Sequence, residues 1–221
     1  MRGSKPMNDQ QAHWENTFRK TPEMFGEEPS DPARRAADLF RQEGAVKILE
    51  LGAGQGRDTI FFARQGFRVH ALDYSEAGLK TISQKAELSG FSPSVKVLRH
   101  DVRLALPFED GSFDACYSHM LFCMALVPEA LEFLAQEIRR ILKPGGLHIY
   151  TVRHTGDSHH GRGIHRGDGM YEMNGFVVRF FSREKVNELA KGYEILGVDE
   201  FEEGPLPRKL FRVTLRKKGA G

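Results

Sequence analysis

Short apolar runs bounded by glycine or turn residues alternate with helical patterns along most of the chain. The apolar runs predict seven strands, at 46–51, 67–73, 95–101, 113–118, 147–152, 193–201 and 209–216. Apolar residues at helical spacing predict helices between them, the first after Ser30 and the last after Ser182. Such alternation is typical of βαβ units. We therefore expect an α/β fold with a seven-stranded, mostly parallel sheet, one late antiparallel strand and helices on both faces.

Three segments depart from this pattern. Residues 1–7 open with Met-Arg-Gly-Ser, like an expression leader, so we expect the single domain to span 8–221. Within 8–28, Trp14 and Phe18 share one helical face, which predicts an N-terminal helical cap. Residues 153–175 hold six glycines and four histidines with little periodicity. We interpret them as a long loop on the substrate side, because such loops are usually functional or disordered.

Composition excludes several classes of protein. The 32 basic and 30 acidic residues nearly balance, which argues against a nucleic-acid partner. Neither a spanning apolar stretch nor an export signal occurs, so we expect a cytoplasmic protein with no membrane partner. The two cysteines form no metal-ligand pattern, and the spacing of the histidines in 153–175 matches no standard zinc site. We therefore predict no metal.

The most informative chemistry lies between the first strand and the helix that follows it. Gly52, Gly54 and Gly56 occur there, where a chain can turn sharply and approach a ligand closely. The dinucleotide fingerprint needs a further glycine, but position 57 is arginine. Carboxylates end this strand and the next two, at the sheet edge where ligands bind in open α/β folds; they are Glu50, Asp73 and Asp101.

Taken in order, these strings resemble those of the class I S-adenosylmethionine-dependent methyltransferases, over roughly residues 30–217. The matching strings are Ile48-Leu49-Glu50-Leu51-Gly52-Ala53-Gly54-Gln55-Gly56, Ala71-Leu72-Asp73, His100-Asp101-Val102, Phe113-Asp114 and Leu142-Lys143-Pro144-Gly145-Gly146. Residues 56–59 are similar to a stretch of the tellurite-resistance-type and thiopurine-like members, which act on small molecules.

The resemblance implies S-adenosylmethionine as cofactor and a Rossmann-like class I fold. It implies that the glycines face the methionine part, that Asp73 holds the ribose and that Asp101 contacts adenine. The full set expected to bind the cofactor is Glu50, Gly52, Ala53, Gly54, Gly56, Asp73, Tyr74, Asp101, Val102 and Ser118. The expected reaction is SN2 transfer of the methyl group to a small-molecule acceptor, by a monomer or homodimer.

The acceptor side follows from the expected fold. Aromatic and polar residues of the N-terminal cap, of the stretch after the fourth strand and of 153–175 are candidates to line the pocket; they are Trp14, Phe18, Met120, Phe122, Arg153 and Tyr171. A histidine could serve as general base, and the candidates are His154, His165 and His119. Ordinary packing is the alternative for the aromatic and methionine side chains.

Other functions stay open. A nicotinamide-dependent oxidoreductase could use a related fold, and a module without catalysis could bind S-adenosylmethionine and report it to a partner. DNA amino methylation is disfavoured, because residues 118–122 lack the Asn/Asp-Pro-Pro-Tyr type of string.

Overall fold

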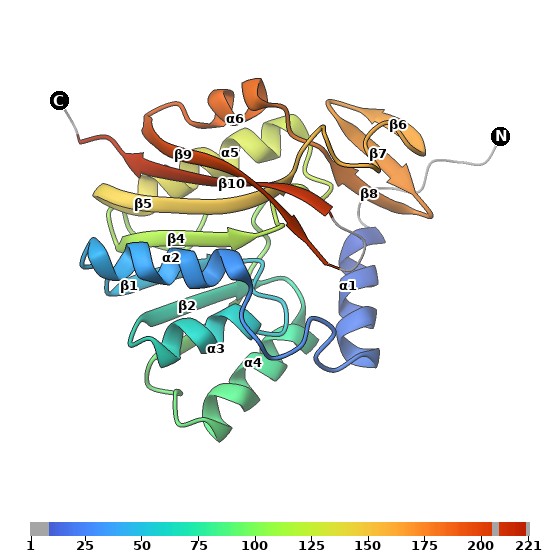
Figure 1. Ribbon diagram of the computed structural model, residues 1–221. Coiled ribbons are helices and arrows are strands. Elements are labelled where there is room, and N and C mark those ends of the chain that lie inside the picture. Colours follow the sequence, from blue (N-terminus) through green and yellow to red (C-terminus); the bar gives the residue numbers. More distant parts are fainter. Residues whose placement is uncertain (1–8, 205–207, 220–221) are drawn as a thin grey trace.

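The computed structural model describes residues 9–204 and 208–219, so the expected leader at 1–7 lies outside the described residues. Its centre is a seven-stranded sheet (Figure 1). In spatial order the strands are β3 (Val95–Arg99), β2 (Arg68–Asp73), β1 (Lys47–Leu51), β4 (Phe113–His119), β5 (Leu142–Arg153), β10 (Arg208–Lys217) and β9 (Tyr193–Glu203). Strand β10 runs antiparallel to both of its neighbours, and all the other pairings are parallel. The predicted sheet, with its one antiparallel strand, is confirmed.

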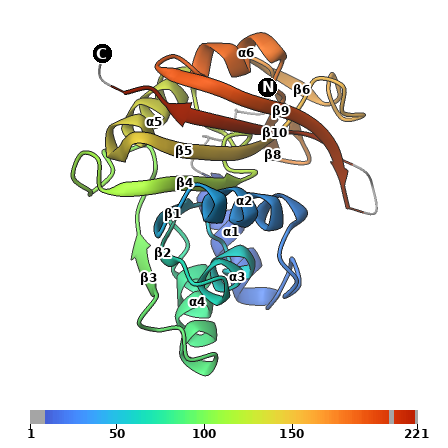
Figure 2. The same ribbon diagram turned by 60° about the vertical axis from the view of Figure 1, so that its left-hand side comes forward.

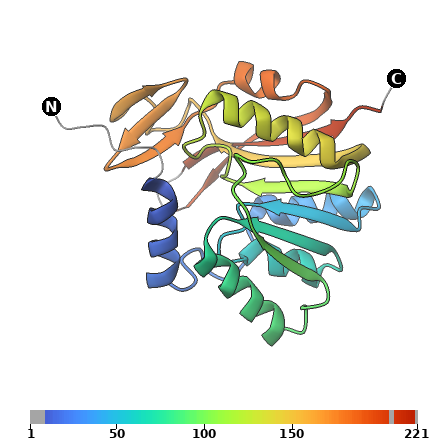
Figure 3. The same ribbon diagram turned by 180° about the vertical axis from the view of Figure 1, so that it is seen from behind.

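Successive residues of the strands face opposite sides of the sheet, and each side is covered by helices. Ile48 belongs to a core beneath α2 (Asp31–Gln42), α3 (Arg57–Arg64) and α4 (Glu76–Leu88). Leu49 belongs to a second core beneath α5 (Pro128–Ile141) and α6 (Arg183–Leu189). Helix α2 lies in front of the sheet in Figures 1 and 2, and α5 comes to the front when the molecule is seen from behind (Figure 3).

The helix starts predicted at serine residues are confirmed. Ser30 accepts a hydrogen bond from the backbone of Ala33, and Ser182 accepts one from the backbone of Lys185. These side chains satisfy amide groups that lack a partner within the first helical turn. One boundary differs, because β5 begins at Leu142, whereas the sequence predicted a strand that begins at residue 147.

The expected long loop at 153–175 is wrong in part, because much of it folds into a second sheet. Strands β6 (Ile164–Gly167), β7 (Met170–Met173) and β8 (Phe176–Arg179) pair in that order and antiparallel. The two connections are Asp168-Gly169 and Asn174-Gly175, and all four residues have positive φ. Two-residue turns of this composition close hairpins, because their twist matches that of the strands.

Helix α1 (Asp9–Lys20) and the small sheet both lie at the end of the main sheet toward which the parallel strands point (Figures 1 and 3). Arg179, which is fully buried, fastens the small sheet there. Its guanidinium donates hydrogen bonds to the carbonyl oxygens of Asp168, at 2.8 Å, and Leu126, at 2.5 Å. No helix among the described residues is long and apolar enough to span a membrane.

Candidate active site

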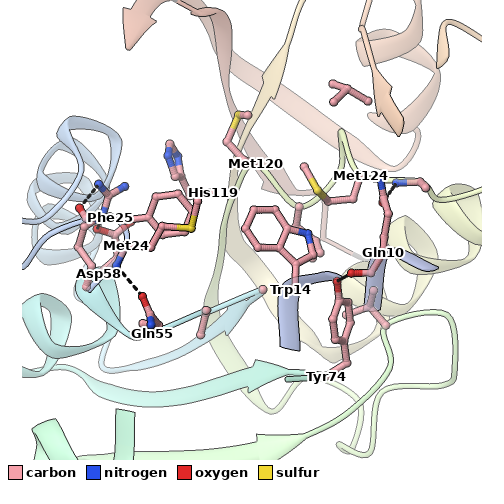
Figure 4. Close-up of a pocket in the computed structure, with 18 of the residues that line it drawn as sticks. Gln10, Trp14, Met24, Phe25, Gln55, Asp58, Tyr74, His119, Met120 and Met124 are labelled. Atoms are coloured by element: carbon pink, nitrogen blue, oxygen red, sulfur yellow. Dashed lines mark hydrogen bonds and ion pairs between the residues drawn. The ribbon is translucent and has the colours of Figure 1, made fainter. Parts of the chain in front are cut away.

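A cavity of about 600 Å³ lies where the carboxyl ends of the parallel strands meet α1 and the small sheet. Its volume is that of a typical small-molecule pocket. Residues from the ends of β1, β2, β3, β4 and β5 all contribute to its wall, among them Gly52, Tyr74, Asp101, His119 and Arg153. Figure 4 shows side chains from α1 and from the strand ends pointing into this space. The cavity therefore occupies the position at which open α/β sheets bind ligands.

The loop after β1 owes its shape to three glycines. Gly52, Gly54 and Gly56 all have positive φ, between 55° and 80°. A Cβ atom at Gly56 would lie only 2.6 Å from Cγ1 of Ile82, and one at Gly52 would lie 3.2 Å from the side chain of Leu121. Only glycine combines this backbone conformation with such close packing. The loop therefore brings its backbone to the wall of the cavity, as predicted.

The backbone amides of this loop are used within the protein. Those of Gly52 and Ala53 donate to the carbonyl oxygen of Leu72, and that of Gly56 donates to the carbonyl oxygen of Ala53. The amide of Gly54 donates to the carboxylate of Asp73 at 2.8 Å. A pyrophosphate-binding loop instead directs its amides at the ligand. This arrangement disfavours a nicotinamide dinucleotide.

Buried carboxyl groups stand behind the glycine loop. Glu50, at the end of β1, lines the cavity and accepts a hydrogen bond of 2.5 Å from the hydroxyl of Thr59. Asp58 also lines the cavity, and its carboxylate accepts hydrogen bonds from the backbone and hydroxyl of Ser30, both 2.8 Å. Burial, together with the neighbouring charge of Asp58, raises the pKa of Glu50 well above its ordinary value. A cationic ligand group would relieve this repulsion.

The end of the cavity formed by β2 and β3 carries a flat ring and a fixed carboxylate. Tyr74 lies beside α1, where its hydroxyl contacts the carbonyl oxygen of Gln10 at 3.4 Å. Asp101 is held by the guanidinium of Arg103 at 2.5 Å, and this hydrogen bond lowers the pKa of the aspartate. Val102 completes this part of the wall. A purine could stack here, with a carboxylate near its edge.

Asp73 is buried beside the cavity and does not line it. Its two oxygens accept hydrogen bonds from the backbone amides of Gly54 and Ser75, each at 2.8 Å. Asp73 thus joins the glycine loop to the end of β2. Its expected contact with a ribose stays a prediction.

The opposite end of the cavity is mostly apolar. Aromatic and methionine side chains from four segments line the wall between Tyr74 and that end, namely Trp14, Met24, Phe25, Met120, Met124, Met173 and Phe176. The polar groups at this end are His119, Glu203 and three arginines, Arg57, Arg153 and Arg208. Figure 4 shows His119 on the side of Met24 and Phe25, away from Tyr74. The cavity thus has a polar end suited to a nucleoside and a largely apolar end suited to a second ligand.

Gln55, in the middle of the glycine loop, fastens α1 over the cavity. Its side-chain amide donates to the carbonyl oxygens of Phe18, at 3.3 Å, and Thr21, at 3.0 Å. Its oxygen accepts a hydrogen bond from the backbone of Met24 at 2.9 Å. Glu15 adds a second attachment, because its carboxylate accepts a hydrogen bond from the hydroxyl of Ser75, at the start of α4.

Most of the residues predicted for the site lie around the cavity. Those that line it are Glu50, Gly52, Ala53, Gly54, Gly56, Tyr74, Asp101, Val102, Trp14, His119, Met120 and Arg153. Those that do not are Asp73, Ser118, Phe18, Phe122, Tyr171, His154 and His165. Phe122 stacks on Tyr150 inside the core. Phe18 is buried on the inner side of α1, where its ring packs beside Gly54. The core-packing alternative thus describes these two side chains.

The two histidines expected in the loop lie away from the cavity. His154 is buried with its ring stacked on Phe211, at a centroid distance of 4.5 Å, and burial lowers its pKa. His165 is exposed on β6, where it packs against Tyr171. Among the described residues, no group of three or more His, Cys, Asp or Glu side chains is arranged to hold a metal ion.

Several residues of the wall were not predicted from the sequence. For Gln55 and Asp58, the signal that could have found them was their position next to the glycines. Glu203 is one of several acids near the end of the predicted strand 193–201, with nothing local to distinguish it. Met173 and Phe176 reach the cavity only because the small sheet folds back over it.

Comparisons with known proteins agree with this geometry. Residues 48–146 match the family model described as a methyltransferase domain. The chain is 25% identical over 199 residues to 24-methylenesterol C-methyltransferase 2 of Oryza sativa subsp. japonica, an alignment covering 83% of this chain and 52% of that protein. The chain spans about half the length of the curated relatives that it matches first.

Solved structures share the fold along nearly the whole chain. The 1,6-didemethyltoxoflavin-N1-methyltransferase of Burkholderia thailandensis, solved with 1,6-didemethyltoxoflavin and S-adenosylhomocysteine bound, aligns with a TM-score of 0.76 at 19% identity, covering 99% of this chain and 93% of that one. TehB from Haemophilus influenzae aligns with a TM-score of 0.69 at 19% identity, covering 93% and 67%. The chain therefore shares the fold of these methyltransferases, and residues 48–146 match a methyltransferase-domain model, in agreement with the resemblance of its motifs. The narrower similarity to the tellurite-resistance type stays a prediction.

Proposed function

We propose that this protein transfers a methyl group from S-adenosylmethionine to a small-molecule acceptor. The observation that carries the proposal is the two-ended cavity, in which a glycine bend and buried carboxyl groups adjoin an apolar pocket. When bound, S-adenosylmethionine supplies a methyl group already activated by a positively charged sulfur. We further infer that the acceptor is not a nucleic acid and that the protein acts as a monomer or homodimer.

The residues present fit this cofactor. Tyr74 and Val102 would flank its adenine ring. The positive-φ glycines let the backbone of the loop approach the ligand without a side chain between them. Asp58 places negative charge where the cationic methionine part would lie, and the cation would favour ionisation of Glu50 beside it. The same charges would bind the neutral demethylated product less strongly, which favours its release.

The residues of this protein mainly position the two ligands and exclude water from the cavity. Helix α1 covers the cavity, with Gln55 holding it against the glycine loop. The apolar end would hold the acceptor against the cofactor in a fixed orientation, and such alignment accelerates a displacement strongly. A dry environment also strengthens the attraction between the buried carboxylates and a cation.

Calorimetry combined with an acceptor screen tests the proposal. S-adenosylmethionine and S-adenosylhomocysteine should both release heat on titration, whereas NAD should not. Incubation with a mixed library of small acceptors should then give at least one product heavier by one methylene, as detected by mass spectrometry. No binding of either S-adenosyl compound would overturn the proposal. Binding without turnover on any acceptor would favour a regulatory module instead.

A further inference from the structure

Glu203 places a carboxylate at the apolar end of the cavity, and two residues support it. Oε2 of Glu203 lies 3.2 Å from Nε2 of His119, at the end of β4. Nδ1 of the same ring lies 2.8 Å from the hydroxyl oxygen of Thr151, on β5. That hydroxyl oxygen also accepts a hydrogen bond of 3.0 Å from the backbone amide of Met120. The four groups form one chain that ends in the cavity.

The direction of each hydrogen bond in this chain follows from its donors. Because the oxygen of Thr151 accepts the amide hydrogen of Met120, its own hydrogen is available to donate to Nδ1 of His119. With Nδ1 accepting from Thr151, Nε2 is the ring nitrogen that donates its hydrogen to Glu203. Both ring nitrogens are engaged in this way. His119 is therefore a positioning residue, and Glu203 is the proton acceptor that faces the ligand.

Charged and hydrogen-bonding groups from three elements surround Glu203. The charged ones are Arg57 of α3, whose Nη2 lies 4.0 Å from Oε1, and Arg208 at the start of β10, and His119 of β4 adds a hydrogen-bond donor. Burial raises the pKa of Glu203, but the hydrogen bond from His119 and the neighbouring positive charges outweigh it, so the pKa lies below its ordinary value. The side chain is thus an anion at neutral pH, ready to accept a hydrogen bond.

The remaining wall at this end suits a flat, apolar ligand. Trp14, Phe25 and Phe176 supply ring surfaces, and Met120 and Met173 supply side chains that adapt to irregular shapes. A ring can lie against such surfaces, and because Arg57, Arg153 and Arg208 can only donate hydrogen bonds, a donor on the ring would be accepted by the carboxylate of Glu203. This combination selects a ring that carries one hydrogen-bond donor.

We propose that Glu203, positioned by His119 and Thr151, binds the O–H or N–H group of a neutral ring acceptor and takes up its proton during methyl transfer. This inference rests on the function proposed above. The shared chemistry is an apolar ring with one hydrogen that is lost on methylation, either that of a phenolic hydroxyl or that of a ring N–H.

The proposed step balances in atoms and charge. A lone pair of a phenol oxygen, or of the hydrogen-free nitrogen of a benzimidazole-type ring, forms the new bond to the methyl carbon, the carbon–sulfur bond breaks, and its electron pair stays on sulfur. The methylated ring becomes positive, which acidifies its O–H or N–H hydrogen, so the proton passes to the carboxylate of Glu203. A carboxylate of low pKa is basic enough to take the proton of the methylated phenol oxygen, which is a far stronger acid, and the N–H proton leaves the azolium cation by the same route.

Binding of simple ring compounds tests the recognition directly. The probes are 4-phenylphenol with its methyl ether 4-methoxybiphenyl, and benzimidazole with 1-methylbenzimidazole, each titrated calorimetrically. At least one hydrogen-bearing probe should bind about 10-fold more tightly than its methylated partner, the scale of a charge-assisted hydrogen bond. Glu203→Gln should remove most of this preference. The matched control Glu202→Gln changes an exposed neighbour outside the cavity and should preserve it.

Turnover of the probe that binds completes the test. Glu203→Gln should lower kcat by about 10²-fold, as expected for loss of a general base, with an unchanged Kd for S-adenosylmethionine. Glu203→Asp should restore part of the rate. Thr151→Val should lower kcat and shift its pH profile while leaving KM nearly constant. Met120 keeps a partner in that variant, because its amide also reaches the carbonyl oxygen of residue 151.

The outcomes separate this inference from the proposed function. If S-adenosylmethionine binds but all four probes fail to bind, or if Glu203→Gln leaves the preference intact, the inference is wrong and the methyl-transfer proposal stands. If the probes depend on Glu203 but S-adenosylmethionine does not bind, the proposed function fails and the recognition of ring donors survives. Preference for the phenol or for benzimidazole identifies the accepting atom as oxygen or nitrogen.

Discussion

Among single residues, Glu50 is one whose place in the site lowers the stability of the folded protein. Its carboxyl group is buried beside Asp58, and the hydrogen bond from Thr59 offsets only part of the cost of ionising it. Buried groups held in unfavourable electrostatic surroundings are common at functional sites. The position of Glu50 therefore makes sense where a cation is to be bound.

We expect Glu50→Gln to stabilise the ligand-free protein above about pH 4.5, the ordinary pKa of a glutamate. The raised pKa of Glu50 means that the folded state holds a proton that the unfolded chain has released, so stability falls as pH rises above that value. Glutamine removes this penalty. The melting temperature at pH 8 should rise, by about 2–4 °C for each kcal/mol gained, and the difference should vanish toward pH 4.

The control for this measurement is Glu87→Gln, which changes an exposed glutamate of α4. It should follow the wild type at every pH. A Glu50→Gln protein that melts below the wild type at pH 8 would contradict the electrostatic argument. The same variant should bind S-adenosylmethionine more weakly, since the cation would favour ionisation of Glu50 and glutamine cannot ionise.

Single residues also show which parts of the site could be predicted. Glu50 and Asp101 were found because carboxylates at consecutive strand ends must meet at one edge of a parallel sheet. Glu203 also lies at the carboxyl end of a strand, β9, at the same edge of the sheet. That strand, however, joins the sheet through an antiparallel neighbour. The place of Glu203 beside His119 depends on the full strand order, and no local motif encodes that order.

At the scale of elements, local patterns predicted the main sheet and its helices but not the small sheet. Strands β6, β7 and β8 have four residues each, too few to show a period. The Asp168-Gly169 and Asn174-Gly175 pairs were hairpin signals within 153–175, and the abundance of glycine and histidine obscured them. Burial of Arg179 then fixes the hairpins in place, and this tertiary contact leaves no sequence pattern.

Helix α1 is attached at its first turn by Gln10, in its middle by Glu15 and at its last turn through Gln55, so one substitution should loosen its last turn. Gln55→Ala removes three hydrogen bonds to the segment 18–24, each worth about 0.5–1.5 kcal/mol. Amide hydrogen exchange should accelerate about 10-fold or more across 18–24, while exchange in β1, β4 and β5 stays as in the wild type.

Gln84→Ala, an exposed change in α4, provides the matched control and should leave exchange of α1 unaltered. If Gln55→Ala accelerated exchange over the whole chain, Gln55 would support the fold in general rather than the attachment of α1. Unchanged exchange in 18–24 would show that Glu15 and the aromatic contacts of Trp14 suffice to hold the helix.

On the scale of the whole molecule, the cavity lies where three segments far apart in the sequence meet. The main sheet supplies the strand ends, α1 supplies Trp14, and the small sheet supplies Phe176, whose ring meets that of Trp14 edge-on at 5.6 Å. A ligand that fills the cavity contacts all three. Binding should therefore raise the stability of the protein and change the surroundings of the Trp14 ring. Trp14 is the single tryptophan of the chain, so its fluorescence reports that change.

S-adenosylmethionine at 100 times its Kd should stabilise the folded state by about 2.7 kcal/mol. For a domain of this size, that gain corresponds to a rise of about 5–11 °C in melting temperature. The intrinsic fluorescence should change over the same concentration range, because Trp14 lines the cavity. NAD should alter neither signal, since the amides of the glycine loop are already paired within the protein. Trp14→Phe should abolish the fluorescence change and keep the thermal shift, whereas equal protection by NAD would mean that the loop accepts a pyrophosphate after all.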